Sequence, residues 1–220
     1  DGLITLKTRR QSLDYDRSED AYLIRDRVKT MVGGEFGYQI GAATSAVIDI
    51  TQTYVRYDEQ LDFVTRDSDE TRVLVGVVWE STAATTGFAK VGYKEKEFED
   101  QSRGTFYGTD WEVGIDWQPV SYSTFRISTS ADTFETNGEG DFIRGQNYSV
   151  RWNHDWLERL STSFSVTQQD DEYVFNEIDI DNRDDELMNY SASLSYQARR
   201  WLKFSTYYQY TDRDSNRETI

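Results

Sequence analysis

The chain has 220 residues, of which 37% are hydrophobic and 15% aromatic, with 24 lysines and arginines against 40 aspartates and glutamates. The resulting net charge of -16 argues against nucleic-acid binding, because phosphate contacts need a cationic surface. Without cysteine the chain has neither a disulfide framework nor a thiolate metal site. No run of about 18 apolar residues predicts a membrane-spanning helix, and no signal peptide is recognisable, so we expect a cytosolic protein or a mature or truncated exported one.

Period-two alternation of apolar and polar residues recurs along the chain, and no long stretch keeps helical spacing. This alternation predicts an all-β fold. Within each segment the apolar residues are mostly even-numbered or mostly odd-numbered. In chain order these sets include Val32, Phe36, Tyr38 and Ile40; Trp111, Val113, Ile115 and Trp117; Phe125, Ile127 and Ala131; Tyr148, Val150 and Trp152; Phe164 and Val166; Tyr190, Ala192, Leu194 and Tyr196; and Phe204, Tyr208 and Tyr210.

Short and long connections alternate between these segments. Short turns are expected near 41–43, 82–85, 118–120, 155–157 and 198–200, with the only proline, Pro119, confined to a tight turn where its missing N–H breaks no ladder bond. Long polar connectors are expected over 14–27, 58–70, 95–104, 135–145, 168–186 and from 212 onward. If each of about eleven strands pairs with the next, the sheet is an up-and-down meander with all short turns at one end.

Strand length separates two kinds of β protein. The segments are about 10 to 14 residues long, whereas a tilted strand needs about 9 to 11 to cross a bilayer and soluble strands are usually shorter. We therefore favour an antiparallel up-and-down transmembrane β-barrel, or a large part of one, over a soluble sandwich. In this interpretation the apolar faces contact lipid, the short turns are periplasmic and the long acidic loops are extracellular.

Tryptophans gather near the predicted short turns. Membrane barrels place aromatic side chains where the apolar band meets the head groups, because an indole is apolar in its body and polar at its N–H. The alternative is that they cap a soluble core. We predict a membrane-interface belt of Trp79, Trp117, Trp152, Trp156 and Trp201.

Carboxylates concentrate in the predicted long connectors, which hold 30 of the 40. Such clusters suit calcium or magnesium, and a weak divalent-cation site is one interpretation of Asp179, Asp181, Asp184 and Asp185. Solvated acidic loops are the interpretation that we favour, because the spacing does not match a calcium-binding loop.

Charges of both signs occupy the positions predicted to face the barrel lumen. A pore selective for one sign of ion would align like charges in rings. We therefore expect a lumen that accommodates neutral or weakly charged polar solutes, or one that cross-strand salt bridges close. The predicted lumen-lining residues are Glu35, Asp49, Glu112 and Asp116 together with Lys90, Lys94, Arg126, Arg151 and Lys203.

Catalysis is not expected. The sole histidine, His154, lies near a predicted short turn, where a structural role is commoner than a general base. No Gly-rich phosphate loop and no His or Cys metal spacing is present, so we expect no cofactor and no catalytic residue.

Three segments carry a family resemblance: WQPVSYSTFRISTSAD, HDWLERLSTSFSV and QARRWLKFSTYYQYTDRDSNRE. Together they resemble a β-barrel porin family of Gram-negative outer membranes that occurs with exopolysaccharide synthesis and export systems. The resemblance implies an outer-membrane location and a role in polysaccharide secretion, with lipid, lipopolysaccharide, polysaccharide and a periplasmic secretion assembly as partners.

We expect one barrel domain over residues 1–220. Eleven strands is an odd number, while single-chain bacterial barrels have even numbers, so we expect either a longer barrel or a mis-split strand near the amino terminus. Three functions remain open: a conduit in polysaccharide export, a structural or surface-interaction barrel with a plugged lumen and acidic cation- or partner-binding loops, and a soluble carbohydrate-binding module.

Overall fold

Eleven β-strands make up almost all of the regular structure in the described part of the chain. The computed structural model describes residues 1–14, 25–58, 65–82, 84–136, 140–175 and 183–217. Among them, no helix is long and apolar enough to cross a membrane. The elements are β1 (Gly2–Leu13), β2 (Arg27–Gly41), β3 (Thr44–Tyr57), β4 (Ser68–Thr82), β5 (Thr85–Phe98), the short 3-10 helix η1 (Gln101–Arg103), β6 (Thr105–Val120), β7 (Ser123–Phe134), β8 (Phe142–Leu157), β9 (Leu160–Val174), β10 (Arg183–Arg199) and β11 (Leu202–Ser215).

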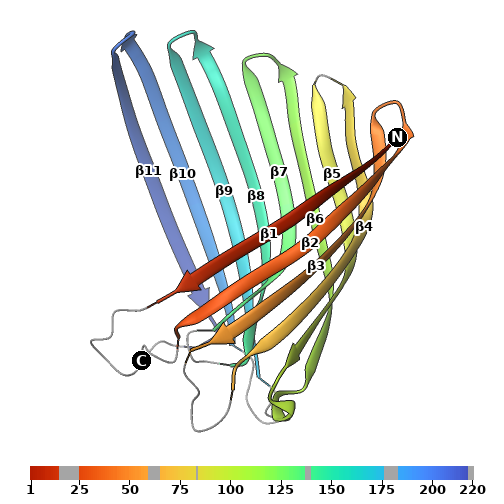
Figure 1. The fold of residues 1–220 in the computed structure, drawn as a ribbon. Coiled ribbons are helices and arrows are strands. Elements are labelled where there is room, and N and C mark those ends of the chain that lie inside the picture. Colours follow the sequence, from red (N-terminus) through yellow and green to blue (C-terminus); the bar gives the residue numbers. More distant parts are fainter. Residues whose placement is uncertain (15–24, 59–64, 83, 137–139, 176–182, 218–220) are drawn as a thin grey trace.

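The strands form one antiparallel sheet in which spatial order equals sequence order, from β1 to β11. This confirms the predicted all-β meander and its eleven strands. The sheet curls into an open half-barrel, with β1 to β4 passing in front of the central strands (Figure 1). Within the described residues β1 pairs only with β2 and β11 only with β10, so these two strands are the edges.

The five short hairpins share one geometry. Each pair of strands is separated by two residues, and each ladder has a register irregularity just before the turn, between Gln39 and Gly41 in the first hairpin. The corresponding irregularities lie at Trp79/Thr82, Trp117/Val120, Asp155/Leu157 and Gln197/Arg199. These bulges carry the first strand further than apolar alternation alone indicates.

Three predicted turns are consequently misplaced. Residues 118–120, including Pro119, belong to the end of β6, and the chain turns at Ser121 and Tyr122 instead. Residues 155–157 likewise belong to β8, and the last turn lies at Arg200 and Trp201. Pro119 is tolerated in the strand because it falls inside the irregular part of the ladder, where its missing N–H interrupts no regular pairing.

The strands also extend further into the acidic segments than predicted. They are 12 to 17 residues long, so parts of the expected connectors 58–70, 95–104, 135–145, 168–186 and 212 onward are paired strand. Apolar alternation ends before the hydrogen-bonded ladder does, because both faces become polar beyond the apolar band. Cross-strand ion pairs such as Arg144 with Glu172 occupy these extensions.

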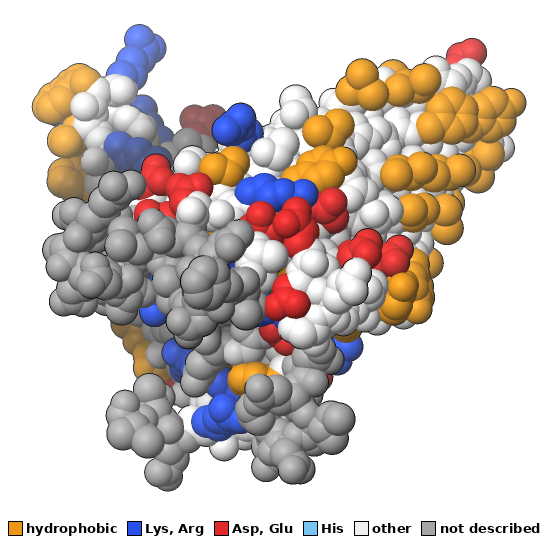
Figure 2. Space-filling model, turned by 60° about the horizontal axis from the view of Figure 1, so that its bottom comes forward, with side chains coloured by type: hydrophobic (Ala, Val, Ile, Leu, Met, Phe, Trp, Pro, Cys, Tyr) orange, Lys and Arg blue, Asp and Glu red, His pale blue; other side chains and the backbone are white. Residues whose placement is uncertain are grey.

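Alternation along the strands gives the sheet two unlike faces. Apolar side chains on the convex face are exposed, with Leu6 at 83% and Ile40 at 60%, while charged side chains of the opposite parity are buried on the concave face. Viewed from the long-connection end, Figure 2 shows hydrophobic side chains on the outer flanks and Lys, Arg, Asp and Glu between them. A closed soluble core would bury the apolar parity instead.

Two glycines permit the tight curvature between β4 and β5. A Cβ on Gly92 would lie 1.8 Å from the Val73 carbonyl oxygen, and one on Gly76 would lie 2.0 Å from that of Ala89. No side chain fits at such distances, so these positions allow the close backbone approach on the concave face.

Candidate functional site

The concave face of β1, β2, β3 and β5 carries a four-residue ion-pair cluster in which Asp49 and Lys90 are buried and Lys7 and Glu35 are half-buried. Lys7 Nζ donates to Asp49 Oδ2 at 2.7 Å and to Glu35 Oε2 at 3.3 Å. Lys90 Nζ donates to the same Asp49 oxygen at 3.2 Å and also contacts Glu35. Two ammonium groups therefore balance two carboxylates, which neutralises this part of the face. Glu35, Asp49 and Lys90 were predicted to share a face, whereas Lys7 was missed although it has the correct parity.

A second cluster lies across β4, β5 and β6. Lys94 Nζ is 2.9 Å from Asp110 Oδ2 and 3.6 Å from Glu70 Oε1. Arg72 donates through Nε to Asp110 Oδ2 at 3.0 Å and through Nη2 to Glu112 Oε1 at 2.7 Å. Lys94 and Glu112 were predicted, but the buried Asp110 and the half-buried Arg72 that join them were not. The sequence could have indicated both residues, because Asp110 precedes the apolar Trp111 and Arg72 precedes the apolar Val73, so each charged side chain points to the face opposite its apolar neighbour.

The third cluster lies at the long-connection end, outside the apolar band. The fully buried Lys96 donates to Glu135 Oε1 at 2.6 Å, and the Tyr57 hydroxyl donates to Glu135 Oε2 at 3.1 Å. Burial opposes ionisation of Glu135, but the charge and hydrogen bond of Lys96 outweigh it, so the pKa of the carboxyl lies below its ordinary value. Glu135 follows the end of β7 directly and joins it to β3 and β5.

The remaining predicted lumen residues are less enclosed. Arg126 donates through Nε to Asp116 Oδ1 at 2.5 Å, in an exposed pair on neighbouring strands. Arg151 and Lys203 are exposed, and neither has an ion-pair partner within the described ranges. The nine predicted residues thus divide into five members of the first two ion-pair clusters (Glu35, Asp49, Lys90, Lys94 and Glu112), one exposed pair and two separate cations.

Serine and threonine residues line the middle of the concave face of β8 to β10, beside the charged Arg151. Ser149 lies opposite Thr167, Ser165 opposite Ser191, and Ser163 opposite Ser193. These residues alternate with convex-face side chains such as Val150, Phe164 and Tyr190. We refer to the following six residues together as the hydroxyl surface: Ser149, Ser163, Ser165, Thr167, Ser191 and Ser193.

An aromatic row crosses four strands on the convex face near the short turns. Trp117 stacks on Phe125 with ring centroids 5.3 Å apart, Phe125 on Trp152 at 5.9 Å, and Trp152 on Phe164 at 5.7 Å. The predicted belt residues Trp117 and Trp152 belong to this row, and Trp156 contacts it through Trp152. Trp201 lies in the last short turn and is 78% exposed, while Trp79 packs against Gly87 on β5.

His154 lies beside the aromatic row. Its ring centroid is 4.3 Å from that of Trp156 and 5.3 Å from that of Trp152. The Nδ1 atom is buried and has no hydrogen-bond partner among the residues that the structure describes.

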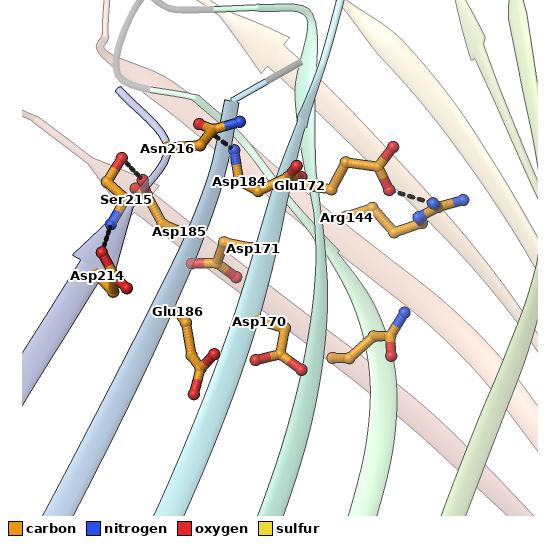
Figure 3. Close-up of a pocket in the computed structure, with 11 residues that line it drawn as sticks. Arg144, Asp170, Asp171, Glu172, Asp184, Asp185, Glu186, Asp214, Ser215 and Asn216 are labelled. Carbon is orange, nitrogen blue, oxygen red and sulfur yellow. Dashed lines mark hydrogen bonds and ion pairs between the residues drawn. The ribbon is translucent and has the colours of Figure 1, made fainter. Parts of the chain in front are cut away.

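An open acidic depression lies at the long-connection end of β8 to β11 (Figure 3). Asp185 accepts hydrogen bonds from Arg183, Arg213 and Ser215, which satisfy its carboxylate. Within the described residues no group of three or more acidic or histidine side chains is arranged to hold a metal ion. Of the predicted cation ligands, Asp184 and Asp185 line the depression, and Asp179 and Asp181 lie outside the described residues.

The long meandering strands, the exposed apolar convex face and the polar concave face define an up-and-down antiparallel β-barrel sheet of the membrane type, open between β1 and β11. Residues 4–220 match the family described as "Putative beta-barrel porin 2", and the chain belongs to this family. The predicted β-barrel porin family is thereby confirmed, while its association with exopolysaccharide export stays a prediction.

Three solved structures are similar to the chain. The FrpB iron transporter from Neisseria meningitidis superposes with a TM-score of 0.60 at 12% identity, covering 96% of this chain and 40% of FrpB. The chain therefore spans less than half the length of that structure. TodX, a monoaromatic hydrocarbon channel, aligns over 96% of this chain and 73% of its own with 10% identity and a TM-score of 0.42. LpxR from Salmonella typhimurium aligns over 84% and 88% with 10% identity and a TM-score of 0.34. No curated protein matches the sequence.

Proposed function

We propose that the protein is a porin-like conduit of the bacterial outer membrane that passes neutral or weakly charged polar solutes, with polysaccharide chains in export as the preferred class. The observation that carries this proposal is the pairing of opposite charges over the concave face of β1 to β6. A ring of like charges would favour one sign of ion, whereas clusters that neutralise themselves favour neither.

The orientation and partners form part of the same proposal. The short turns face the periplasm and the acidic long connections face outward, as in bacterial barrels with short periplasmic turns. Lipid and lipopolysaccharide contact the convex face, and a secretion assembly delivers polysaccharide from the periplasmic side. We infer no catalytic role, because His154 contacts aromatic rings on the convex face, away from the polar lumen.

A second function is favoured by the same clusters if they fill the lumen. Lys90 on β5 reaches Asp49 on β3, and Arg72 on β4 reaches Asp110 on β6, so these contacts span non-adjacent strands. A lumen closed by such bridges would make the protein a structural barrel with acidic surface loops. The carboxylates of the open depression would then serve partner binding.

Conductance of the purified protein in planar lipid bilayers separates the two functions. A conduit gives stable single-channel currents with a cation-to-anion permeability ratio near unity in a potassium chloride gradient. Reversible block by a neutral oligosaccharide such as maltohexaose supports solute passage. A strongly ion-selective current contradicts the proposed lumen, and an absence of current from protein with heat-modifiable gel migration favours the structural barrel.

A further inference from the structure

The concave face has two chemically distinct sectors. In β1 to β6 most charged groups of this face already have partners in the ion-pair clusters, as in the contacts of Asp49 with Lys7 and Lys90. In β8 to β10 the corresponding positions carry the hydroxyl surface, and exposed Arg151 on β8 lies directly opposite Ser165 on β9. The boundary falls at β7, where Ser128 and Ser130 follow Arg126 on the same face.

The groups of the hydroxyl surface are available to a solute. Ser163, Ser165, Ser191 and Ser193 are half-buried, and none of them has a side-chain hydrogen bond to another described residue. Each hydroxyl offers one donor and two acceptor lone pairs, and its hydrogen can rotate toward a partner. Exchange of water for a solute hydroxyl at these positions leaves no buried group unsatisfied, whereas opening an ion-pair cluster would.

The spacing of these hydroxyls forms a regular grid. Alternate residues along one strand are about 7 Å apart, and directly paired strands are about 4.8 Å apart. Ser163 and Ser165 on β9 face Ser193 and Ser191 on β10, which places four hydroxyls at the corners of one cell of this grid. Within this cell an extended chain with many hydroxyl groups can exchange hydrogen bonds with four serines, and the fixed charge that borders the cell is Arg151 on β8, opposite Ser165.

We propose that the hydroxyl surface is the track along which a neutral, polyhydroxylated chain moves, while the ion-paired sector of β1 to β6 is a wall that does not bind it. This inference rests on the proposed conduit function and assigns the solute contact within it. Individual hydrogen bonds to water-accessible hydroxyls are weak, which suits a track because each contact must release as the chain advances. Repetition over neighbouring cells supplies the affinity.

The test is the block of single-channel current by maltohexaose in the full chain and in two variants. The track variant S163A/S165A/S191A/S193A removes four hydroxyls without changing charge. The control variant S45A/S128A/S130A removes three hydroxyls from half-buried positions on β3 and β7. We expect the track variant to bind maltohexaose about tenfold more weakly at unchanged open-channel conductance, and the control variant to bind it within about twofold of the unaltered chain.

Each outcome bears on a different claim. Equal block of the unaltered chain and the track variant overturns the track while leaving the conduit function standing. Current without any block by maltohexaose overturns the track and its neutral solute, and tighter binding of an oligogalacturonate than of maltohexaose does the same. Absence of current overturns the conduit function and the inference with it. Heat-modifiable migration of both variants verifies that they fold.

Discussion

At the scale of single residues, the structure places ionised groups where a soluble protein would place apolar ones. Lys96 and Asp110 are each 1% exposed, and both make ion pairs shorter than 3 Å. Such pairs gain little over apolar packing of equal shape, but removal of one partner leaves a buried charge without compensation. These ion pairs hold the charged side chains of the concave face in place, and removal of one partner is expected to lower the free energy of unfolding substantially.

Substitution of Glu135 tests this cost. We expect Glu135→Gln to destabilise the folded protein by about 3 kcal/mol at pH 7, because Lys96 then lies buried without its counter-charge. Urea unfolding in lipid vesicles, followed by tryptophan fluorescence, measures the change. Asp116→Asn is the control, because its partner Arg126 is exposed and the loss should be below about 1 kcal/mol.

The same variant has a defined pH dependence. Because the folded-state pKa of Glu135 lies below its ordinary value of 4.5, the stability from its ionisation is complete above that value and is lost as the pH falls through the lower folded pKa. The difference between Glu135→Gln and the unaltered chain should therefore be constant from pH 6 to pH 8 and shrink below about pH 4. A difference that grows on acidification contradicts the assigned ion pair.

At the scale of elements, cross-strand pairs hold the hairpins in register on both faces. The aromatic row joins β6, β7, β8 and β9 through successive stacked rings, and Trp152 also donates its Nε1–H to Ser123 Oγ at 2.8 Å. A slip by one residue would move every ring to the polar face, so the row specifies register as well as contributing stability.

A double-mutant cycle on Phe125 and Trp152 measures this contribution. We expect a coupling free energy of about 0.5 to 1.5 kcal/mol between Phe125→Leu and Trp152→Leu, the range for stacked aromatic pairs. Equilibrium unfolding in lipid vesicles gives the four stabilities. The pair Phe125 and Trp201 serves as the control and should show coupling near zero, because Trp201 lies in the turn after β10. Equal coupling free energies in both cycles would show that the coupling does not come from the stacking of Phe125 on Trp152.

At the scale of the whole molecule, the sheet has three kinds of surface. The convex face is apolar, the concave face of β1 to β6 carries ion pairs, and the concave face of β8 to β10 carries hydroxyl groups. The exposed convex side chains need an apolar environment, while the concave face keeps polar groups in contact with one another or with water. Electrical balance across the concave face is then a property of the assembled sheet, because partners such as Lys7 and Asp49 are 42 residues apart.

Lys7→Gln tests that balance in a planar bilayer. Loss of Lys7 leaves Glu35 and Asp49 with one cation, so we expect the cation-to-anion permeability ratio to rise about twofold. Arg10→Gln removes the same charge from the opposite face of β1 and should leave the ratio unchanged, since Arg10 alternates with the concave positions. Reversal potentials in a potassium chloride gradient give the ratios, and equal shifts in both variants would place Lys7 outside the conduction path.

Local alternation was sufficient for the strands but not for their ends. The apolar parity of Val32, Phe36 and Tyr38 correctly predicted the exposed face of β2, because a period of two is a property of neighbouring residues. The β-bulges before the turns and the polar ends of the strands were not predicted, because neither feature changes the alternation of apolar residues. Pro119 was misplaced for that reason and lies in β6, not in the turn.

The sequence alone determined the all-β class, the meander of eleven strands, the polarity of the two faces and the family, because each depends on patterns within one or two neighbouring strands. Only the tertiary structure decided which charges meet. Asp110 and Arg72 are joined across non-adjacent strands by the curl of the sheet, and the hydroxyl surface becomes distinct only when β8, β9 and β10 lie side by side. Curvature brings together residues that are distant in the chain, and no local pattern encodes its degree.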